Sequence, residues 1–122
     1  MAETDRRLIE AAVRDYFEGW FDGDVSRMDR ALHPNLAKRS PAADRGASLA
    51  ITTKERMLEL TAAGEGAEDG KDRRLEIAID DVADDIASVT VRSAVYHEYV
   101  HLVWTDDGWK IANTLWRPAL TP

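Results

Sequence analysis

The residues whose types and spacing could support chemistry lie in one C-terminal run, His97-Glu98-Tyr99-Val100-His101. This run matches the H-E-x-x-H pattern of zinc proteases, in which two histidines one helical turn apart bind the same ion. The surrounding segment, VTVRSAVYHEYVHLVWT, is rich in β-branched and aromatic residues and therefore predicts a strand. Four residues of a strand span about 13 Å, too far for both imidazoles to share one ion. We therefore expect no metal site here.

Other motifs that carry chemistry are absent from the sequence: there is no glycine-rich phosphate loop and no nucleophile elbow. The acidic run IDDVADD at 79–85 reads as a turn between strands, so its carboxylates are expected to be solvated. We therefore expect no buried Asp or Glu as a general base, and no cofactor. Lys38 and Arg39, on a short predicted strand, are likewise expected to be solvated, although either could neutralise an anionic ligand.

In a strand, the residues of the H-E-x-x-H run alternate between two faces, and the next turn fixes the pairing. Asp106-Asp107-Gly108 is a strong hairpin signal between two strand-like runs. If Gly108 forms a bulge, Thr105 lies opposite Trp109. Counting back then pairs Val103 with Ile111, His101 with Asn113, Tyr99 with Leu115 and His97 with Arg117.

The elements that must position this hairpin are predicted by hydrophobic spacing. Residues 5–22 repeat apolar side chains along one helical face, which predicts a long helix ending at Gly23. Asp24 is the expected N-cap of a short second helix that ends before Pro34. Thr52 with Glu55 predicts a capping box for a third helix that ends at Gly64.

The remaining segments predict strands and one loop. Strand-like runs cover 75–79, about 86–105 and 109–117, and weaker ones lie within 36–51, while 65–74 predicts a mobile polar loop. Helices segregated from a mostly antiparallel sheet indicate an α+β fold. All Phe, Tyr and Trp side chains lie in 16–21 and 96–116. We therefore expect the first helix to lie across the C-terminal hairpin.

Composition limits the possible classes of protein. The chain of 122 residues fits one domain, 1–122, with 44% hydrophobic and 32% charged residues, as in a soluble globular protein. Its net charge of −7 argues against binding to nucleic acid or to an anionic membrane. The absence of cysteine excludes disulfides and thiol catalysis. With no apolar signal segment or membrane span, a cytoplasmic location is expected.

Two stretches, YFEGWFDGDVSRMDRALHPNLAKRS and VHLVWTDDGWKIANTLW, resemble the nuclear-transport-factor-2-like (NTF2-like) superfamily. Within it, the chain is similar to the small bacterial branch labelled "putative lumazine-binding", which also looks polyketide-cyclase-like. The matching pieces are the end of the first helix from Tyr16 to Gly19, Gly23-Asp24, Leu32-His33-Pro34 and Gly108-Trp109-Lys110-Ile111. The resemblance implies a cone-shaped, cystatin-like α+β fold, in which a curved, mostly antiparallel sheet wraps around a long N-terminal helix. It also implies a pocket at the open end and dimers formed through the convex sheet face.

The resemblance places the residue matching Ile111 on the concave side of the sheet. With the register above, the expected ligand-binding residues are Tyr16, Trp20, His97, Tyr99, His101 and Asn113. We interpret the protein as a domain that binds a small, partly apolar organic molecule. One alternative is a cyclase, isomerase or dehydratase that uses His101 or His97 as acid and base. Another is a non-catalytic dimerisation module with a filled core, in which His101 and Asn113 form a hydrogen-bonded pair.

The same register predicts an apolar patch on the opposite, outward face of the hairpin. Its members are Val100, Leu102, Trp104 and Trp116. Such a patch is too large for a monomer to expose, so a homodimer through this face is expected.

Overall fold

The computed structural model describes residues 2–42, 44 and 46–120, and over these residues it contains three α-helices, one short 3-10 helix and six strands. The helices are α1 (Ala2–Asp22), α2 (Val25–Ala31), α3 (Lys54–Ala62) and the 3-10 helix η1 (Asp69–Lys71). The strands are β1 (Leu32–Pro41), β2 (Leu49–Thr52), β3 (Leu75–Ala83), β4 (Ile86–Ser93), β5 (Tyr96–Thr105) and β6 (Gly108–Pro118). In this part of the chain no helix has the length and apolar character needed to cross a membrane.

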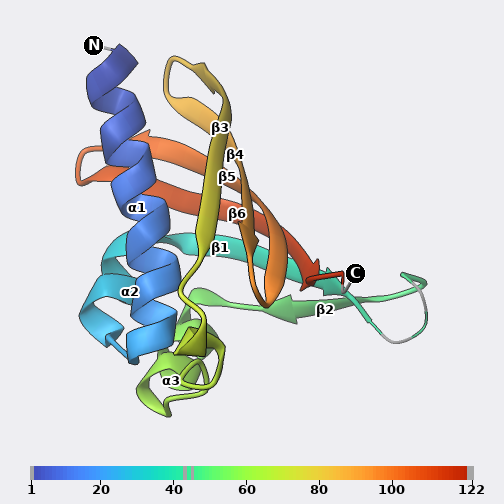
Figure 1. The fold of residues 1–122 in the computed structure, drawn as a ribbon. Helices are drawn as coiled ribbons and strands as arrows, with labels where there is room; N and C mark the ends of the chain where they lie inside the picture. The colour runs from blue at the N-terminus through green and yellow to red at the C-terminus, as the bar shows by residue number, and fades with distance from the viewer. Residues whose placement is uncertain (1, 43, 45, 121–122) are drawn as a thin grey trace.

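The six strands form one curved, open sheet in the order β2-β1-β6-β5-β4-β3. Strands β1 and β6 are parallel, and all other neighbours are antiparallel. Helix α1 lies across the concave face of the sheet, and α2 and α3 lie near the C-terminal end of α1 (Figure 1). This arrangement is the cone-shaped α+β fold that the resemblance implies.

The helix ends follow local capping chemistry. Gly23 ends α1 with φ of 65°, a left-handed conformation that glycine adopts without steric cost. Asp24 then begins α2 as predicted, because its side chain accepts a hydrogen bond from the Arg27 backbone N–H at 3.1 Å. The third helix is capped one residue later than predicted. Its N-cap is Thr53, which accepts from the Arg56 N–H at 3.1 Å.

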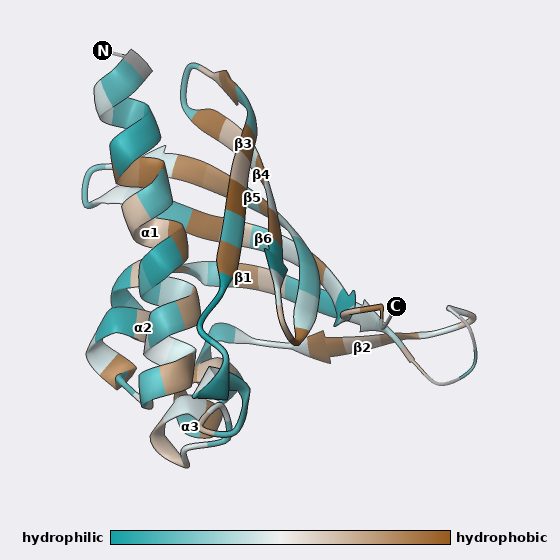
Figure 2. Ribbon diagram, in the orientation of Figure 1, coloured by the Kyte–Doolittle hydropathy of each residue, from teal (hydrophilic) through white to brown (hydrophobic). Residues whose placement is uncertain are grey.

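The core lies between α1 and the central strands. The helix contributes a buried stripe made of Ile9, Ala12, Val13, Tyr16, Phe17 and Phe21. Opposite it, Leu102 and Ile111 pair across the β5–β6 hairpin and are 1% and 0% exposed. Figure 2 shows hydrophobic and hydrophilic residues alternating along these strands. Burying each of these two side chains contributes roughly 1.5–3 kcal/mol.

The hairpin register is correct far from the turn and wrong near it. The predicted pairs His101–Asn113, Tyr99–Leu115 and His97–Arg117 are confirmed. Nearer the turn, however, Leu102 pairs with Ile111 and Thr105 with Gly108, which leaves Ala112 as the extra residue. The bulge therefore lies at Ala112 and not at Gly108. Because side chains alternate with a period of two, this extra residue places Ile111 and Asn113 on opposite faces.

The same bulge overturns the predicted outward patch. Val100 and Leu102 face α1 and are 0% and 1% exposed. Trp116 also faces the interior, where it lines a cavity. Trp104 stands edge-on to the buried Trp109, with ring centroids 5.9 Å apart, and is partly exposed at the end of the sheet. These four side chains therefore do not form an outer surface for a second copy.

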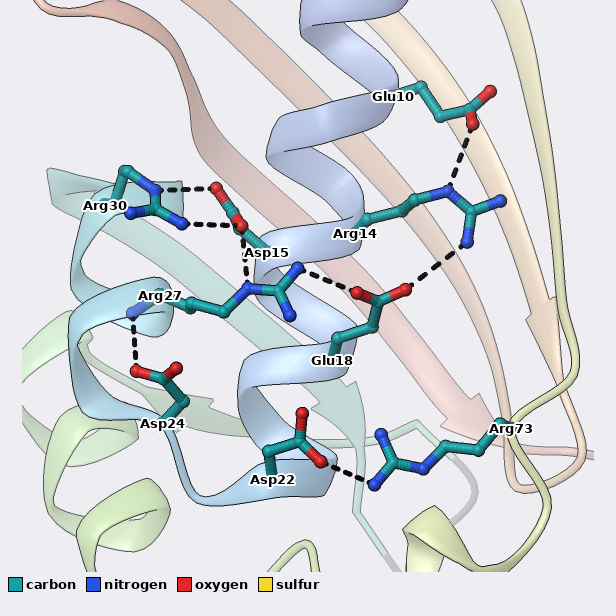
Figure 3. A network of polar contacts seen from close by, with 9 residues as sticks. All are labelled: Glu10, Arg14, Asp15, Glu18, Asp22, Asp24, Arg27, Arg30 and Arg73. Atoms are coloured by element: carbon teal, nitrogen blue, oxygen red, sulfur yellow. Dashed lines mark hydrogen bonds and ion pairs between the residues drawn. The ribbon is translucent and has the colours of Figure 1, made fainter.

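Ion pairs fix the helices and the 65–74 segment to one another (Figure 3). Arg27 of α2 donates to Asp15 at 2.9 Å and to Glu18 at 2.8 Å, both on α1. Arg73 pairs with Asp22 at the end of the same helix. The 65–74 segment, predicted as a mobile loop, thus contains η1 and is packed against α1.

Candidate functional site

A cavity of about 400 Å³ opens between the C-terminal half of α1, α3, η1 and the inner face of β1, β5 and β6. Its apolar wall consists of Phe17 from α1 and of Met57 and Leu60 from α3. Aromatic rings from α1 and the hairpin, namely Trp20, Tyr96 and Trp116, form a second wall. The volume and the mostly apolar lining are typical of small-molecule sites.

A cluster of three polar side chains, Tyr16, Lys38 and Glu98, lies in the cavity wall. The Tyr16 hydroxyl donates to Glu98 Oε2 at 2.6 Å. Lys38 Nζ donates to the Tyr16 oxygen and, at 3.3 Å, to the same Glu98 oxygen. Tyr16 is 3%, Lys38 7% and Glu98 2% exposed, so the ion pair is almost fully removed from bulk water.

Strand alternation and helical spacing bring the cluster together. Lys38 lies two residues after Leu36 on β1, and both side chains point inward. Glu98 continues the inward row of Val100 on β5 in the same way. Tyr16 reaches the cluster from one turn before Trp20 on α1.

Burial sets the protonation chemistry of the cluster. Burial and the adjacent Glu98 carboxylate raise the pKa of Tyr16 well above its ordinary value, so the phenol keeps its proton. Burial lowers the pKa of Lys38, and the attraction of Glu98 offsets only part of this effect. The Lys38 ammonium also lies 5.0 Å and 5.2 Å from the ring centroids of Tyr16 and Trp116. Because burial outweighs these attractions, the pKa of Lys38 is lowered and it loses its proton more readily than a solvated lysine does.

A second polar group, Asp69 of η1, lies at the edge of the cavity. Its Oδ2 accepts a hydrogen bond from Trp20 Nε1 at 2.9 Å and another from the Tyr96 hydroxyl. Burial, together with the hydrogen bond to Asp69, raises the pKa of Tyr96 above its ordinary value. One carboxylate from the 65–74 segment thus fixes the orientation of two side chains in the aromatic wall, Trp20 and Tyr96.

Two buried polar atoms near the cluster are unsatisfied. Among the residues that the structure describes, Trp116 Nε1 and Thr114 Oγ1 have no hydrogen-bond partner. Thr114 is the β6 neighbour of Lys38, and Trp116 lines the cavity. Buried polar groups normally have partners, so an unpaired donor beside a cavity indicates room for a ligand acceptor.

Only two of the six predicted ligand-binding residues line the cavity: Tyr16 and Trp20. The side chains placed on the other, outer side of the sheet are His97, Tyr99, His101 and Asn113. Tyr99 is 52% exposed, while His97 is half-buried with its ring centroid 5.1 Å from that of Tyr99. The Ala112 bulge places these four side chains on the outer side, because the sequence prediction takes the inner face of the hairpin from Ile111 and assumes unbroken alternation.

Glu98 is not among the site residues expected from the sequence, and Lys38 is expected there only as a solvated side chain that could neutralise an anionic ligand. The expectation that no carboxylate is buried is wrong for Glu98, and the expectation that Lys38 is solvated is wrong as well. A usable signal was present, since Glu98, Val100 and Leu102 alternate on one face of a strand. The strand prediction for the His97–His101 run is confirmed by β5. Over the described part of the chain, no group of three or more metal-binding side chains is present.

Residues 4–117 match the protein family described as "Putative lumazine-binding". Comparison with curated proteins gives no match. Among solved structures, the chain is similar to an NTF2-like protein of unknown function from Silicibacter pomeroyi DSS-3, with a TM-score of 0.77 and 15% identity over 98% of this chain and 99% of that one. It is also similar to an NTF2-like protein of unknown function from Shewanella baltica OS155, with a TM-score of 0.76 and 12% identity over 99% of this chain and 98% of that one.

A third similar structure, from Streptomyces avermitilis, is described as a "putative dehydratase from the NTF2-like family". Its TM-score is 0.63 at 17% identity, over 99% of this chain and 100% of that one. At these identities the similarity shows a common fold.

Proposed function

Since the chain belongs to the family described as "Putative lumazine-binding", within the NTF2-like superfamily, we propose that it binds a small, partly aromatic organic molecule in the cavity. The observation that carries this proposal is one wall that combines aromatic rings with the buried Tyr16–Lys38–Glu98 cluster. A filled, purely structural core would not leave about 400 Å³ beside a buried ion pair.

The geometry supports a flat ligand with hydrogen-bond acceptors. A planar ring would pack on Trp20 and Tyr96, whose positions Asp69 fixes. A carbonyl or ring nitrogen at its inner end would accept from Lys38 or from the unpaired Trp116 Nε1. Lumazine, named in the family description, is a fused heteroaromatic ring with carbonyl groups and meets these requirements.

Fluorescence titration of the whole chain with lumazine tests this proposal, because Trp20 and Trp116 line the cavity. We expect saturable quenching and at least about tenfold weaker binding for Trp116→Phe, which loses a ring face and a donor. Trp104→Phe is the matched control, since Trp104 lies outside the cavity and is 46% exposed. Equal effects of the two substitutions would contradict the proposed site.

A second candidate function is a proton-transfer enzyme of the isomerase, cyclase or dehydratase type. The observation that favours it is the unbroken hydrogen-bond chain from Lys38 through Tyr16 to Glu98. His101 and His97, the acid–base groups expected from the sequence, lie on the outer side of the sheet. Deuterium exchange at the α-carbon of cyclohexanone, followed by NMR, should stop in Glu98→Gln and persist in His101→Ala.

We also propose that residues 1–122 act as one domain that forms a homodimer through the outer sheet face. Exposed apolar side chains lie on this face at Ile51 of β2 and at the paired positions Leu115 and Tyr99, which are 72%, 47% and 52% exposed. The exposed Arg39 of β1 lies between Ile51 and Leu115. Large exposed apolar side chains on a sheet face are typical of a surface covered by a second copy.

A further inference from the structure

Lys38 is a buried primary amine in the wall of a cavity, and its neighbours can take up and return protons. Its side chain is 9% exposed and contacts Tyr16 and Glu98. The proposed binding function needs only a donor at this position. A lysine that burial makes easier to deprotonate, beside a phenol and a carboxylate, is also equipped as a nucleophile.

We propose that Lys38 captures aldehydes or ketones that enter the cavity, by forming a Schiff base between its Nζ and the carbonyl carbon. This inference rests on the proposed function, because the carbonyl compound must first bind in the same cavity. It goes beyond that function by assigning the ligand class and a covalent step to one side chain.

The hydrogen-bond chain supplies the neutral amine that this chemistry needs. Lys38 donates to the Tyr16 oxygen, and Tyr16 donates to Glu98. One proton can therefore pass from the ammonium to the Tyr16 oxygen while the phenolic proton moves to Glu98. The result is a free amine and a protonated Glu98 carboxyl, with no net charge in the buried site.

The covalent step then balances within the cluster. The Nζ lone pair attacks the carbonyl carbon, and the carbonyl oxygen takes up the proton of the Glu98 carboxyl, which Tyr16 relays. The nitrogen then returns one proton to Glu98, which gives a neutral carbinolamine. That proton next protonates the hydroxyl group, which leaves as water while the nitrogen lone pair forms the C=N bond. One water is released for each imine formed, and no oxidant or reductant is required.

The cavity wall indicates which carbonyl compounds would fit. Phe17, Met57 and Leu60 are apolar, and Trp20 and Tyr96 present aromatic faces. An aryl aldehyde or aryl ketone matches this lining better than a hydrophilic sugar does. Asp69 and Glu65 at the cavity add negative charge, so a carboxylate on the carbonyl compound would be repelled.

The other lysines of the chain provide internal controls. Lys54 pairs with Asp29 at 3.1 Å, Lys71 is 75% exposed beside Glu68, and Lys110 donates to the Arg30 carbonyl oxygen. None of these lines the cavity. Simple accessibility would therefore favour labelling of Lys71, whereas the proposed chemistry favours Lys38.

Reductive trapping with 4-hydroxybenzaldehyde and sodium cyanoborohydride, followed by peptide mass spectrometry, tests the inference on the unmodified protein. We expect Lys38 to be alkylated at least about tenfold faster than Lys71, with the difference growing as the pH is lowered toward neutral. Tyr16→Phe should slow labelling of Lys38 by about tenfold or more and leave labelling of Lys71 unchanged. Lys38→Arg should abolish the fast label.

A parallel titration with 4-hydroxybenzyl alcohol separates this inference from the proposed function. The alcohol has the same ring and no carbonyl carbon to attack, so its binding reports on the cavity alone. Saturable binding of the alcohol with labelling of Lys38 no faster than of Lys71 would overturn the Schiff base and leave the binding function standing. Fast labelling of Lys38 that persists in Tyr16→Phe and Glu98→Gln would overturn the proton relay.

Discussion

At the scale of single residues, the ion pair between Lys38 and Glu98 is the feature that most distinguishes this cavity. Removing two charges from water costs several kcal/mol for each ion. The attraction between Lys38 Nζ and Glu98 Oε2, 3.3 Å apart, offsets that cost only when further hydrogen bonds satisfy both groups. Tyr16 supplies the additional bond by donating to Glu98. The pair is therefore stable as a unit and costly to break from one side.

A double-mutant cycle should show this coupling. We expect Glu98→Leu alone to lower the free energy of unfolding by roughly 3–5 kcal/mol, because it leaves the Lys38 charge buried and unpaired. The double variant Lys38→Met and Glu98→Leu should lose less free energy of unfolding than either single variant does, as measured by urea unfolding. If the two losses simply add, the pair is not coupled and the description of the cluster is wrong.

Tyr16 predicts a pH dependence at the alkaline end. Its pKa is raised in the folded state above the unfolded value of about 10, so the stability it adds is fully present below pH 10 and is lost as the pH rises through the folded value. The free energy of unfolding of the unmodified chain should therefore fall more steeply above pH 10 than that of Tyr16→Phe. Chemical denaturation at several pH values measures both slopes. Tyr99→Phe, at an exposed position, should retain the steep fall.

At the scale of elements, the 65–74 segment decides the shape of the cavity. It carries Asp69 to the two aromatic donors Trp20 and Tyr96. It also runs so close to α1 that a Cβ at Gly66 would overlap the carbonyl oxygen and indole ring of Trp20. Glycine is therefore needed at Gly66 for close approach, whereas Gly64 needs it for a φ of 76°.

These two glycines provide a matched pair of substitutions. Gly66→Ala should destabilise the chain by about 1–3 kcal/mol through overpacking and should also weaken lumazine binding, because Trp20 must shift. Gly64→Ala should lower the free energy of unfolding by about 1–2 kcal/mol through backbone strain. It should leave binding unchanged, since nothing lies within 4 Å of its added Cβ. Unfolding and titration experiments on both variants separate the effects. Unaltered binding in Gly66→Ala would show that the segment does not shape the site.

At the scale of the whole molecule, the curved sheet has two faces with different roles. The inner face holds the core and the cavity, while the outer face carries the exposed apolar side chains of Ile51, Leu115 and Tyr99. A second positive charge placed at Leu115, between Arg39 and Tyr99, should prevent association of two copies without reaching the cavity.

Leu115→Arg should therefore convert a dimer into a folded monomer in light scattering coupled to size exclusion. Leu8→Arg on α1 is the matched control, because Leu8 is 46% and Leu115 is 47% exposed. We expect the control to retain the mass of the unmodified chain. A monomeric unmodified chain, or loss of the dimer in both variants, would contradict association through the outer face.

The sequence by itself determined the elements and their chemical character. Apolar spacing in α1, the Asp24 cap and the Asp106-Asp107 turn act over a few residues, so local rules predict them. The concentration of aromatic side chains in α1 and the hairpin likewise predicted that these two elements pack together. The helical period predicts that Tyr16 and Trp20 lie on the inner face of α1, and the family resemblance implied the pocket beside them.

Only the tertiary structure decided how the inner face of β5 continues onto β6, because the alternation of Val100 and Leu102 favours that face of β5 but does not locate the bulge. One extra residue at Ala112 reverses the alternation, and nothing local distinguishes a bulge there from one at Gly108. That single residue turned His101 outward and Glu98 inward, and it moved the chemistry from the histidines to Lys38, Tyr16 and Glu98. The pairing of Lys38 with Glu98 joins β1 to β5 across the intervening β6, a contact that depends on packing over the whole sheet.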